Sequence, residues 1–321
     1  MRAVRFHRHG GPDVLQLDEV AVPEPAAGQV LIQAEAIGAN AIDTVLRRGG
    51  SPWDRPLPGT LTGDVVGRVV KLGPGTPPGL LGQRASALSE DAFADYAVAD
   101  AAFLAPVPDD ADAGEATMMS MTAPLAYRLL ETGQVAPGST VLIQSAAGTV
   151  GHLAVQLASS YDPKTIIGTA SSAQRLDFIR ELGAEPVDLT DPEWTARVRE
   201  LAPDGVDTVL DSVGGTVFDQ GLDLLAPLGR MITYGAITTE VPVVSVLKLF
   251  GLKSVTGVSL GGWQQTRPDE ARADIAEVTR RWQSGELRPV VDATHPLADV
   301  ASIHETLDAR ANLGRLVATP E

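Results

Sequence analysis

The first hundred residues have the hydrophobic pattern of short strands separated by turns. Three β-rich runs cover residues 29–40, 64–73 and 91–100, and clusters of Gly and Pro lie between them. Residues 71–82, KLGPGTPPGLLG, are predicted to form a loop from their composition. The pattern therefore predicts a first region built mainly from strands.

From about Pro124 the pattern changes to helices alternating with short apolar strands. Near the start of one helix, Val150, Leu153, Ala154, Leu157 and Ala158 fall on a single face. The predicted strands cover residues 139–145, 164–170, 205–215 and 229–235, and further predicted helices cover 123–133, 171–183 and 216–227. Short buried strands that alternate with helices predict a parallel sheet covered on both faces.

After about Ser259 the pattern breaks up again, and residues 315–321 are predicted to form a strand that returns to the first region. The chain contains no internal repeat. We therefore predict a β-rich domain of residues 1–120 plus 261–321 and an α/β domain of residues 121–260.

Composition limits the partners of the protein. Of its 321 residues 44% are hydrophobic, and the formal net charge is −16. This acidic balance repels nucleic acid and anionic membrane surfaces and argues against both as partners. The absence of Cys rules out disulfides, thiolate metal sites and Cys nucleophiles. Neither a signal peptide nor an apolar run of bilayer length is found in the sequence, so we expect a cytoplasmic protein.

A run of small residues, SAAGTVG over 145–151, separates a predicted strand from the helix that follows it. It matches G-x-G-x-x-G with Ala in the first position, and a second strand begins about fifteen residues later. Small side chains let a diphosphate approach the main chain, and a helix N-terminus attracts its charge. A simple tight turn is the alternative, but it needs one Gly only. The predicted diphosphate contacts are Ala146, Gly148, Thr149, Val150 and Gly151.

The end of the second strand indicates which dinucleotide binds. An NAD site carries Asp or Glu there, for the ribose 2′-hydroxyl. This chain instead offers Ser171, Ser172 and Arg175, which are donors that suit a 2′-phosphate. In the competing interpretation a serine only caps the helix and Arg175 lies in solvent. The residues favour NADP(H).

Six segments in a fixed order resemble a known family. They are AIGANAIDTVLRRGG (36–50), LTGDVVGRVVKLGPG (61–75), DAFADYAVAD (91–100), SAAGTVG (145–151), DSVGG (211–215) and NLGRLVA (312–318). Over nearly the whole chain the sequence resembles the zinc-independent quinone oxidoreductases of the medium-chain dehydrogenase/reductase superfamily, the group that includes zeta-crystallin. The resemblance implies an α/β fold in which a Rossmann-type, doubly wound parallel-sheet domain is inserted into a GroES-like, β-rich catalytic domain.

The chain departs from zinc-dependent relatives at their G-H-E motif. Thr62-Gly63-Asp64 stands there without the His, and the Cys ligands are missing as well. We therefore expect no metal site. Without zinc, a hydrogen-bond donor has to polarise the acceptor carbonyl, which suits a quinone or conjugated ketone that delocalises the developing charge.

The resemblance places Asn40 and Asp43 in the substrate cleft beside the nicotinamide. The Asn40 amide is a potential donor to the acceptor or the cofactor, and Asp43 a group that orients this amide or a water. The competing interpretation makes them the cap and first turn of a helix. Further cofactor contacts, for which plain packing is the alternative, are Thr122, Val213, Gly214, Tyr234, Gly235 and Arg315, the last standing where relatives have a Lys near the phosphates.

These observations predict an NADPH-dependent reductase of a small quinone or α,β-unsaturated carbonyl, with solvent as the proton source. Members of the family commonly dimerise through the edge strand of the cofactor domain, here residues 254–260, so we expect a homodimer. Two alternatives stay open. One is a non-catalytic NADPH-binding protein. The other is a serine hydrolase that uses Ser259 of GVSLG, with Asp292 and His295 or Asp299 and His304. The elbow of such hydrolases requires a helix directly after the Ser, and we expect none there.

Overall fold

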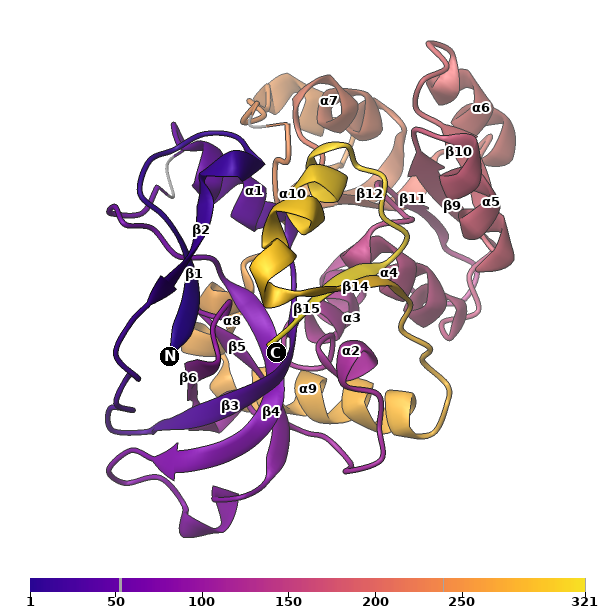
Figure 1. The fold of residues 1–321 in the computed structure, drawn as a ribbon. Coiled ribbons are helices and arrows are strands. Elements are labelled where there is room, and N and C mark those ends of the chain that lie inside the picture. Colours follow the sequence, from indigo (N-terminus) through magenta and orange to yellow (C-terminus); the bar gives the residue numbers. More distant parts are fainter. Residues whose placement is uncertain (52–53, 239, 321) are drawn as a thin grey trace. The chain divides into compact units, whose positions relative to one another are not determined.

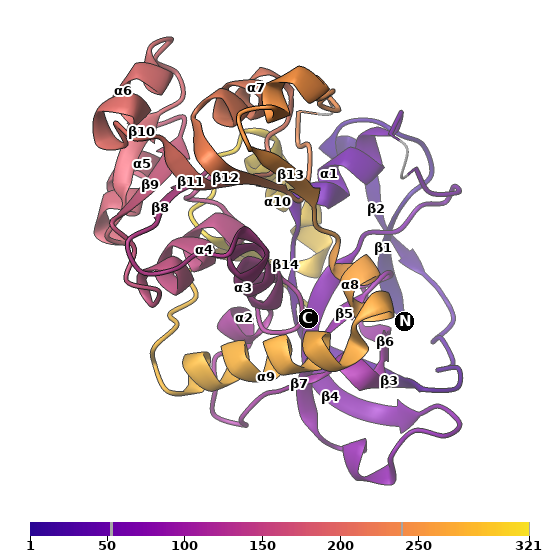
Figure 2. The same ribbon diagram turned by 180° about the vertical axis from the view of Figure 1, so that it is seen from behind.

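The computed structural model describes residues 1–51, 54–238 and 240–320. The chain divides into two compact units (Figures 1 and 2). Unit 1 comprises Met1–Pro124, Ala271–Gln283 and Pro289–Glu321, and unit 2 comprises Leu125–Glu270 and Ser284–Arg288. Unit 2 thus interrupts unit 1 along the sequence. The predicted domain bounds at residues 120 and 260 stay a prediction.

Unit 2 is built on a six-stranded sheet in which every neighbouring pair is parallel. Its strands lie in the order β10-β9-β8-β11-β12-β13 (Figure 2). Their bounds are β8 Thr140–Ile143, β9 Thr165–Ala170, β10 Glu185–Asp188, β11 Val206–Asp211, β12 Leu225–Thr233 and β13 Ser254–Gly257. The order reverses between β8 and β11, which is the point where doubly wound sheets bind dinucleotides.

Helices connect strands of unit 2: α4 Thr149–Ser159, α5 Ala173–Glu181, α6 Trp194–Leu201 and α7 Gly215–Asp223. Helix α3 Thr122–Gly133 precedes β8, and α8 Leu260–Thr266 follows β13. Trp194 of α6 and Phe218 of α7 share one apolar cluster with strand residues such as Val209, so both helices pack on the same face. Helices α4 and α5 contact each other through the His152 and Phe178 rings. Because parallel connections are right-handed, α4 and α5 lie on the opposite face.

Unit 1 is built on a seven-stranded sheet and a separate antiparallel pair, β1-β2. Six strands follow the order β14-β15-β3-β4-β5-β7, and β6 pairs with β3. The strands are β1 Arg2–Phe6, β2 Leu15–Glu19, β3 Gln29–Gly38, β4 Gly63–Leu72, β5 Arg84–Ser89, β6 Tyr96–Asp100, β7 Ala105–Pro106, β14 Val291–Pro296 and β15 Arg315–Thr319; the helices are α1 Ala41–Arg48, α2 Ala113–Ala116, α9 Pro268–Gln283 and α10 Val300–Asp308.

Strand β15 brings the C-terminal part of the chain into the sheet formed by the N-terminal part. Val317 and Ala318 pair with Gly38 and Ile37 of β3, and Leu316 lies in the same apolar core as Ile32. Helix α10 lies beside α1 (Figure 1), where Asp308 binds Arg47 and Arg48, each at 2.6 Å. The predicted return of residues 315–321 to the first region is confirmed over Arg315–Thr319, and Glu321 lies outside the described residues.

Several other expectations need correction. The predicted strand at residues 91–100 is formed only over Tyr96–Asp100. After Ser259, where the pattern breaks up and no element was predicted before residue 315, the chain forms α8, α9, β14 and α10. Helix α9 carries Ala271, Ile275, Val278 and Trp282, all buried, at helical spacing among charged residues. The charged residues of α9 outnumber the four residues of this stripe, which is why the pattern did not indicate the helix.

Candidate functional site

The predicted phosphate loop lies at the carboxyl end of β8, where the chain turns into α4. Ser145 has a φ of 54°, in the left-handed region that a residue with a side chain adopts only at a cost. Ala146 and Ala147 are fully buried, and the Ala146 N–H donates to Thr169 O of the neighbouring strand at 3.0 Å. The small residues therefore let the loop fold tightly against β9.

Gly151 and Gly148 have different roles in this loop. A Cβ atom at Gly151 would lie 2.3 Å from Ser145 O and 2.7 Å from the Ala146 Cα, so α4 packs on the loop backbone with no space for a side chain. A Cβ atom at Gly148 would be 3.3 Å from Ser145 O and 3.8 Å from Arg175 Nη2. Gly148, with φ −80°, needs no unusual conformation and lies between the loop and Arg175.

Helix α4 begins at Thr149, directly after this loop. The N–H groups in the first turn of a helix have no carbonyl partner within the helix, and the helix dipole places partial positive charge there. Thr149, Val150 and Gly151 form this turn, and the His152 N–H donates to Gly148 O at 3.0 Å. The arrangement suits an anion such as a diphosphate.

Ser171, Ser172 and Arg175 lie where β9 passes into α5. Both serines are exposed, and Ser172 occupies the N-cap position, although in the described part of the chain its side chain makes no capping hydrogen bond. Arg175 is only 5% exposed, and its guanidinium reaches back toward Gly148. The competing interpretation, in which Arg175 lies in solvent, is therefore wrong. Among the described residues, the Ser172 hydroxyl also makes no capping hydrogen bond to α5.

Asp211 organises the carboxyl ends of β11 and β12. Its carboxylate accepts the N–H groups of Val213 at 3.2 Å and Gly214 at 3.3 Å, and its carbonyl accepts the Tyr234 N–H at 2.9 Å. Burial raises the pKa of Asp211 to about 6, and the N–H groups of Gly214 and Val213 oppose the rise. Gly214 has a φ of 76°, which side chains disfavour. Asp211, which the sequence analysis did not name, thus holds the main chain of three predicted cofactor contacts, Val213, Gly214 and Tyr234.

Tyr234 and Gly235 continue from β12. Tyr234 is half-buried, and burial raises the pKa of its phenol to about 12, so the ring stays neutral at physiological pH. Gly235 is exposed and has space for a side chain, since its nearest neighbour would be 3.7 Å from a Cβ. The structure therefore places both at the carboxyl edge of the sheet, as expected from the strand pattern.

Asn40 and Asp43 begin helix α1 in unit 1. The Asp43 carboxylate accepts the Asn40 N–H at 3.2 Å, the Thr62 N–H at 2.7 Å and the Thr62 hydroxyl at 3.1 Å. It is fully buried and contacts the main chain of Asn40 rather than its amide. Asp43 thus joins α1 to the segment before β4. Burial raises the pKa of Asp43 to about 7, against the lowering effect of these donors.

This raised pKa predicts that Asp43 destabilises the fold as pH rises from about 4 to about 7. The unfolded carboxyl ionises near 3.8, whereas the folded one keeps its proton to about pH 7. Between these values the native state binds more protons, so a rising pH favours unfolding, by up to about 4 kcal/mol. Asp43→Asn cannot titrate and should melt with a flatter pH dependence. Thermal melts of both proteins from pH 4 to 8 measure this; parallel curves would contradict it.

Arg315 lies at the start of β15, fully buried beside Asn40. Its Nη2 is ion-paired with Asp64 at the start of β4, and its Nη1 donates to Asn40 Oδ1 at 2.9 Å and Thr122 Oγ1 at 3.0 Å. Burial raises the pKa of Asp64, and the Arg315 guanidinium opposes that rise. The structure brings three predicted residues together here, with Arg315 bound to protein groups of unit 1. A contact of Arg315 with cofactor phosphates stays a prediction.

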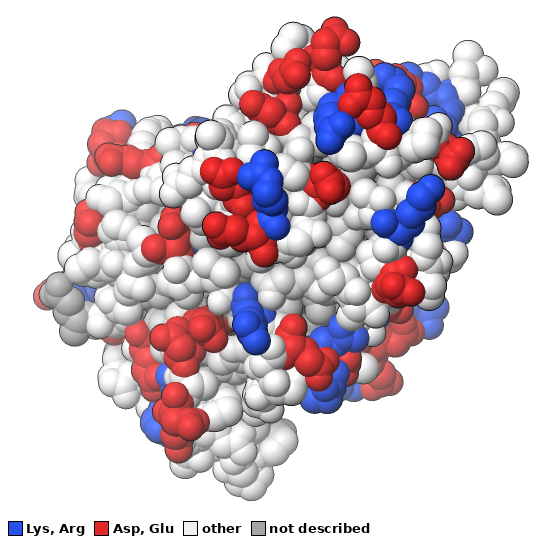
Figure 3. Space-filling view, turned by 90° about the vertical axis from the view of Figure 1, so that its right-hand side faces the viewer, with Lys and Arg blue, Asp and Glu red and all other residues white. Residues whose placement is uncertain are grey.

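Among the described residues, neither a cluster of metal ligands nor a membrane-spanning helix is found. In residues 1–51, 54–238 and 240–320 no group of three His, Asp or Glu side chains could hold a metal ion. No helix in that part of the chain combines the length and apolar composition needed to cross a bilayer. Acidic and basic side chains are interspersed on the face drawn in Figure 3.

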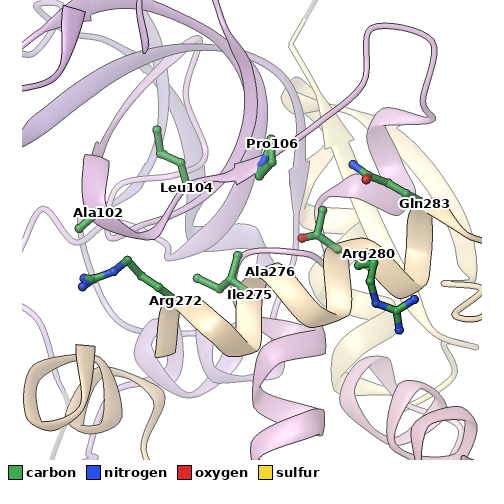
Figure 4. Close-up of a pocket in the computed structure, with 9 residues that line it drawn as sticks. Ala102, Leu104, Pro106, Arg272, Ile275, Ala276, Arg280 and Gln283 are labelled. Carbon is green, nitrogen blue, oxygen red and sulfur yellow. The ribbon is translucent and has the colours of Figure 1, made fainter. Parts of the chain in front are cut away.

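A pocket of unit 1 lies between α9 and the segment around β7 (Figure 4). Leu104 and Pro106 lie on one side of it, and Arg272, Ile275 and Arg280 come from α9. It contains none of the predicted site residues. The sequence analysis missed it because α9 itself was not predicted.

The hydrolase alternative is weakened by the geometry of Ser259. Our expectation that no helix follows this residue was wrong, since α8 begins at Leu260. However, Ser259 has ordinary extended φ and ψ of −121° and 124°, not the strained turn of a nucleophile elbow, and its Oγ caps α8 by accepting the Gly262 N–H at 3.3 Å.

The acid–histidine pairs considered for the hydrolase are not formed either. His295 lies 3.4 Å from Asp299, and Asp292 instead accepts the Leu313 N–H at 3.2 Å. His304 is fully buried, and burial lowers its pKa to about 3. It therefore stays a neutral imidazole within unit 1.

The sequence analysis missed the roles of Asp64 and Asp211, although both left a signal. Each is a fully buried acid next to a pair of apolar residues, Val65-Val66 after Asp64 and Val209-Leu210 before Asp211. A carboxylate in such a position must be paired or hydrogen-bonded. Their partners, Arg315 and the 213–214 main chain, could have been sought from that requirement.

Comparison with known proteins identifies the family. Residues 26–109 match the model of the alcohol dehydrogenase GroES-like domain, and residues 149–278 match that of the zinc-binding dehydrogenases. The chain is 31% identical over 336 residues to 2-haloacrylate reductase of a Burkholderia species and 31% identical over 327 residues to quinone oxidoreductase 1 of Escherichia coli K12, with 99% of both chains covered in each case. It is also 31% identical over 341 residues to the mouse synaptic vesicle membrane protein VAT-1 homolog-like, covering 99% of this chain and 81% of that protein.

Solved structures support the same family assignment. A mycobacterial protein in complex with NADPH matches with a TM-score of 0.92 and 34% identity, and E. coli quinone oxidoreductase in complex with NADPH matches with a TM-score of 0.90 and 29% identity; both matches cover 100% of each chain. The predicted GroES-like and Rossmann-type fold is confirmed. The chain belongs to the quinone oxidoreductase family of the medium-chain dehydrogenase/reductase superfamily.

Proposed function

We propose that the protein is an NADPH-dependent oxidoreductase that transfers hydride to a quinone or an α,β-unsaturated carbonyl compound. The observation that carries the proposal is the loop at residues 145–151, where Gly151 leaves no space for a side chain and α4 begins directly after the loop. Relatives named quinone oxidoreductase and 2-haloacrylate reductase both reduce conjugated acceptors according to their names.

The residues that would hold NADPH divide by the part of the cofactor they suit. The loop and first turn of α4 suit the diphosphate, and Arg175 with the two exposed serines suits the 2′-phosphate. The ends of β11 and β12, organised by Asp211, suit the remaining ribose and nicotinamide part. When bound, the cofactor supplies a hydride; the reaction also takes up one proton, which we assign to solvent.

The direct test follows NADPH absorbance with a panel of quinones, enones and 2-haloacrylates. We expect saturable oxidation of NADPH, a much weaker rate with NADH, and no effect of a metal chelator. Cofactor affinity is measured separately by fluorescence titration. Saturable binding without turnover on any acceptor would favour the alternative of a non-catalytic NADPH-binding protein. No binding of either coenzyme would refute the proposal.

We also propose a homodimer that forms through the edge of the unit 2 sheet. Strand β13 is last in the strand order, and apolar side chains just before it are exposed: Val241, Val243, Val246, Leu247, Phe250 and Leu252. Exposed apolar clusters of this kind mark contact surfaces. We propose the cytoplasm as its location, because NADPH is maintained inside cells as a reductant; cell fractionation tests this.

The dimer proposal predicts that Phe250→Asp yields a monomer. A charge in an apolar contact would be desolvated on association, which disfavours the dimer. Light scattering after size exclusion should give a dimer mass for the wild type and a monomer mass for this variant. Leu81→Asp, at a residue of unit 1 that is 57% exposed, is the control and should remain dimeric. A wild-type monomer at micromolar concentration would contradict the proposal.

A further inference from the structure

The pocket between α9 and the segment around β7 (Figure 4) is a cavity of about 280 Å³ within unit 1. This volume is close to the lower end of the range of small-molecule sites, about 300 Å³. Residues from two stretches of chain line the cavity, 102–106 and 272–283. The stretches lie far apart in sequence, and neither includes a residue that the sequence analysis assigned to the coenzyme or the acceptor. A ligand held there would occupy a site of its own.

The middle of the pocket is apolar. Leu104 and Pro106 lie on either side of Ala105, which is fully buried, so their side chains point to the opposite side of the strand, where the pocket lies. Ile275 lines the other wall and is 4% exposed. Hydrocarbon placed between these walls would be removed from water, which favours binding. The pocket therefore suits a ligand with an apolar body.

The wall formed by α9 presents its side chains in a defined order. Arg272, Ile275, Thr279 and Gln283 all line the pocket, and successive members of this set are three or four residues apart. Residues at this spacing form one stripe on a helix. Along the helix axis, Arg272 and Thr279 lie roughly 10 Å apart. A ligand that follows the stripe meets a guanidinium, then an apolar side chain, then a hydroxyl and an amide.

The hydroxyl of Thr279 provides an observation that is independent of the shape of the pocket. Thr279 is 3% exposed, and its Oγ1 is buried without a hydrogen-bond partner within the described residues. A threonine hydroxyl in a helix can bond to the carbonyl one turn earlier, but that of Thr279 does not. The large majority of buried polar atoms have a partner. Because Thr279 lines the pocket, a polar group of a ligand can supply the missing partner.

The charge of the pocket differs from that of the whole protein. The formal net charge is −16, but the charged side chains that line the pocket, Arg272 and Arg280, are both basic. Glu277 accepts from Arg280 Nε at 3.1 Å and Nη2 at 3.2 Å, and hydrogen bonds from neighbouring arginines lower the pKa of Glu277 to about 2. This ionised acid offsets the charge of Arg280, whose side chain extends away from Pro106, whereas that of Arg272 extends toward Ala102 (Figure 4). An anionic group of a ligand therefore belongs at the Arg272 end.

We propose that this pocket binds a small organic carboxylate whose apolar chain carries a second oxygen at its far end, such as an ω-hydroxycarboxylate of about eight carbons. The carboxylate binds Arg272, because a guanidinium has several N–H donors and can accept this ligand in addition to its contacts within the protein. The chain lies between Leu104 and Ile275, and the distal oxygen accepts the Thr279 hydroxyl. This inference does not rest on the proposed function.

The test compares three probes by isothermal titration calorimetry. They are ω-hydroxyoctanoate, octanoate, which lacks the distal oxygen, and octanediol, which lacks the charge. We expect ω-hydroxyoctanoate to bind with a Kd of about 1 mM or below. Each of the other two should bind about 5-fold more weakly, as on loss of one hydrogen bond or one exposed ion pair. Equal affinity for all three, or no binding at millimolar concentration, would overturn the proposal.

Two substitutions assign each preference to a residue. Thr279→Val should abolish the preference for ω-hydroxyoctanoate over octanoate, and its melting temperature should not fall, because the hydroxyl that it removes has no partner. Arg272→Gln should abolish the preference over octanediol. The control is Arg8→Gln, which removes an exposed arginine paired with Asp13 at 3.0 Å in the same unit and should keep both preferences. Preferences that remain unchanged in Thr279→Val and Arg272→Gln would overturn the assignment.

Ala276→Phe tests the location of the site. Ala276 is exposed and lines the pocket, so a larger side chain should fill the cavity and weaken binding of ω-hydroxyoctanoate about 10-fold or more. The control is Ala273→Phe, at a residue that is exposed on the same helix and is not part of the pocket wall. It should bind like the wild type, and circular dichroism should show both variants folded. Unchanged binding in Ala276→Phe would place the probe elsewhere, as on the exposed apolar side chains before β13, and would overturn the proposal.

Discussion

Gly151→Ala should bind NADPH at least 100-fold more weakly than the wild type and melt at a lower temperature. The added Cβ would lie 2.3 Å from Ser145 O and 2.7 Å from the Ala146 Cα, and neither backbone atom can move without opening the loop. Overpacking of this kind costs about 1–3 kcal/mol or more. The displaced loop would no longer present the first turn of α4 to the diphosphate. Fluorescence titration with NADPH and thermal melting measure the two effects.

Gly148→Ala tests cofactor binding by the same loop in a variant whose fold should be intact. Its Cβ would be 3.3 Å from Ser145 O, and its φ of −80° suits any residue, so the fold should survive. The methyl group would stand between the loop and Arg175, where the cofactor approaches, and should weaken binding about 10-fold. Gly261→Ala, in α8 with open space around it, is the control. Wild-type affinity in Gly151→Ala would show that the diphosphate binds elsewhere.

Arg175→Met should lower the affinity for NADPH about 100-fold and leave the weak affinity for NADH nearly unchanged. The guanidinium of Arg175 supplies the charge-assisted hydrogen bonds that a 2′-phosphate needs, and NADH has no such phosphate. Methionine fills much of the volume of the buried aliphatic stem, so the packing of α5 is largely kept. The ratio of the two dissociation constants, measured at one ionic strength, is the readout.

A second arginine on the same helix provides the control for Arg175. Arg180 is largely exposed and paired with Asp177 at 2.5 Å, three residues away. Arg180→Met removes the same charge from α5 without touching the site, so its coenzyme preference should equal that of the wild type. An equal loss of NADPH affinity in both variants would mean that Arg175 acts only through the overall charge of the helix.

The parts of the fold that sequence predicted best are those with local signals. Strands β8, β9 and β11 are short apolar runs between Gly and polar residues, and the loop before α4 is a run of small residues that few other structures need. Helix α9 was missed because charged residues outnumber its apolar stripe at Ala271, Ile275, Val278 and Trp282. Counting apolar positions at helical spacing, rather than overall hydropathy, would have found it.

The candidate site was predictable in its residues but not in its connections. Asn40, Thr122 and Arg315 were each named from sequence, yet nothing local indicates that one guanidinium binds the other two. That contact depends on β15 pairing with β3, which is a long-range event. Asp43 illustrates the same limit, because its carboxylate contacts Thr62 and the Asn40 main chain rather than the amide that it was expected to orient.

The pairing of Arg315 with Asp64 also bears on biosynthesis. The ribosome adds Arg315 251 residues after Asp64, so the nascent chain carries an acid destined for burial long before its counter-charge exists. Domains generally fold as units during translation. The segment Leu125–Glu270 is continuous and can fold first. The sheet of unit 1 can be completed only after β15 has been synthesised. Until then Asp64 remains hydrated or protonated, and a ribosome stalled before that point would carry an incomplete, protease-sensitive first half.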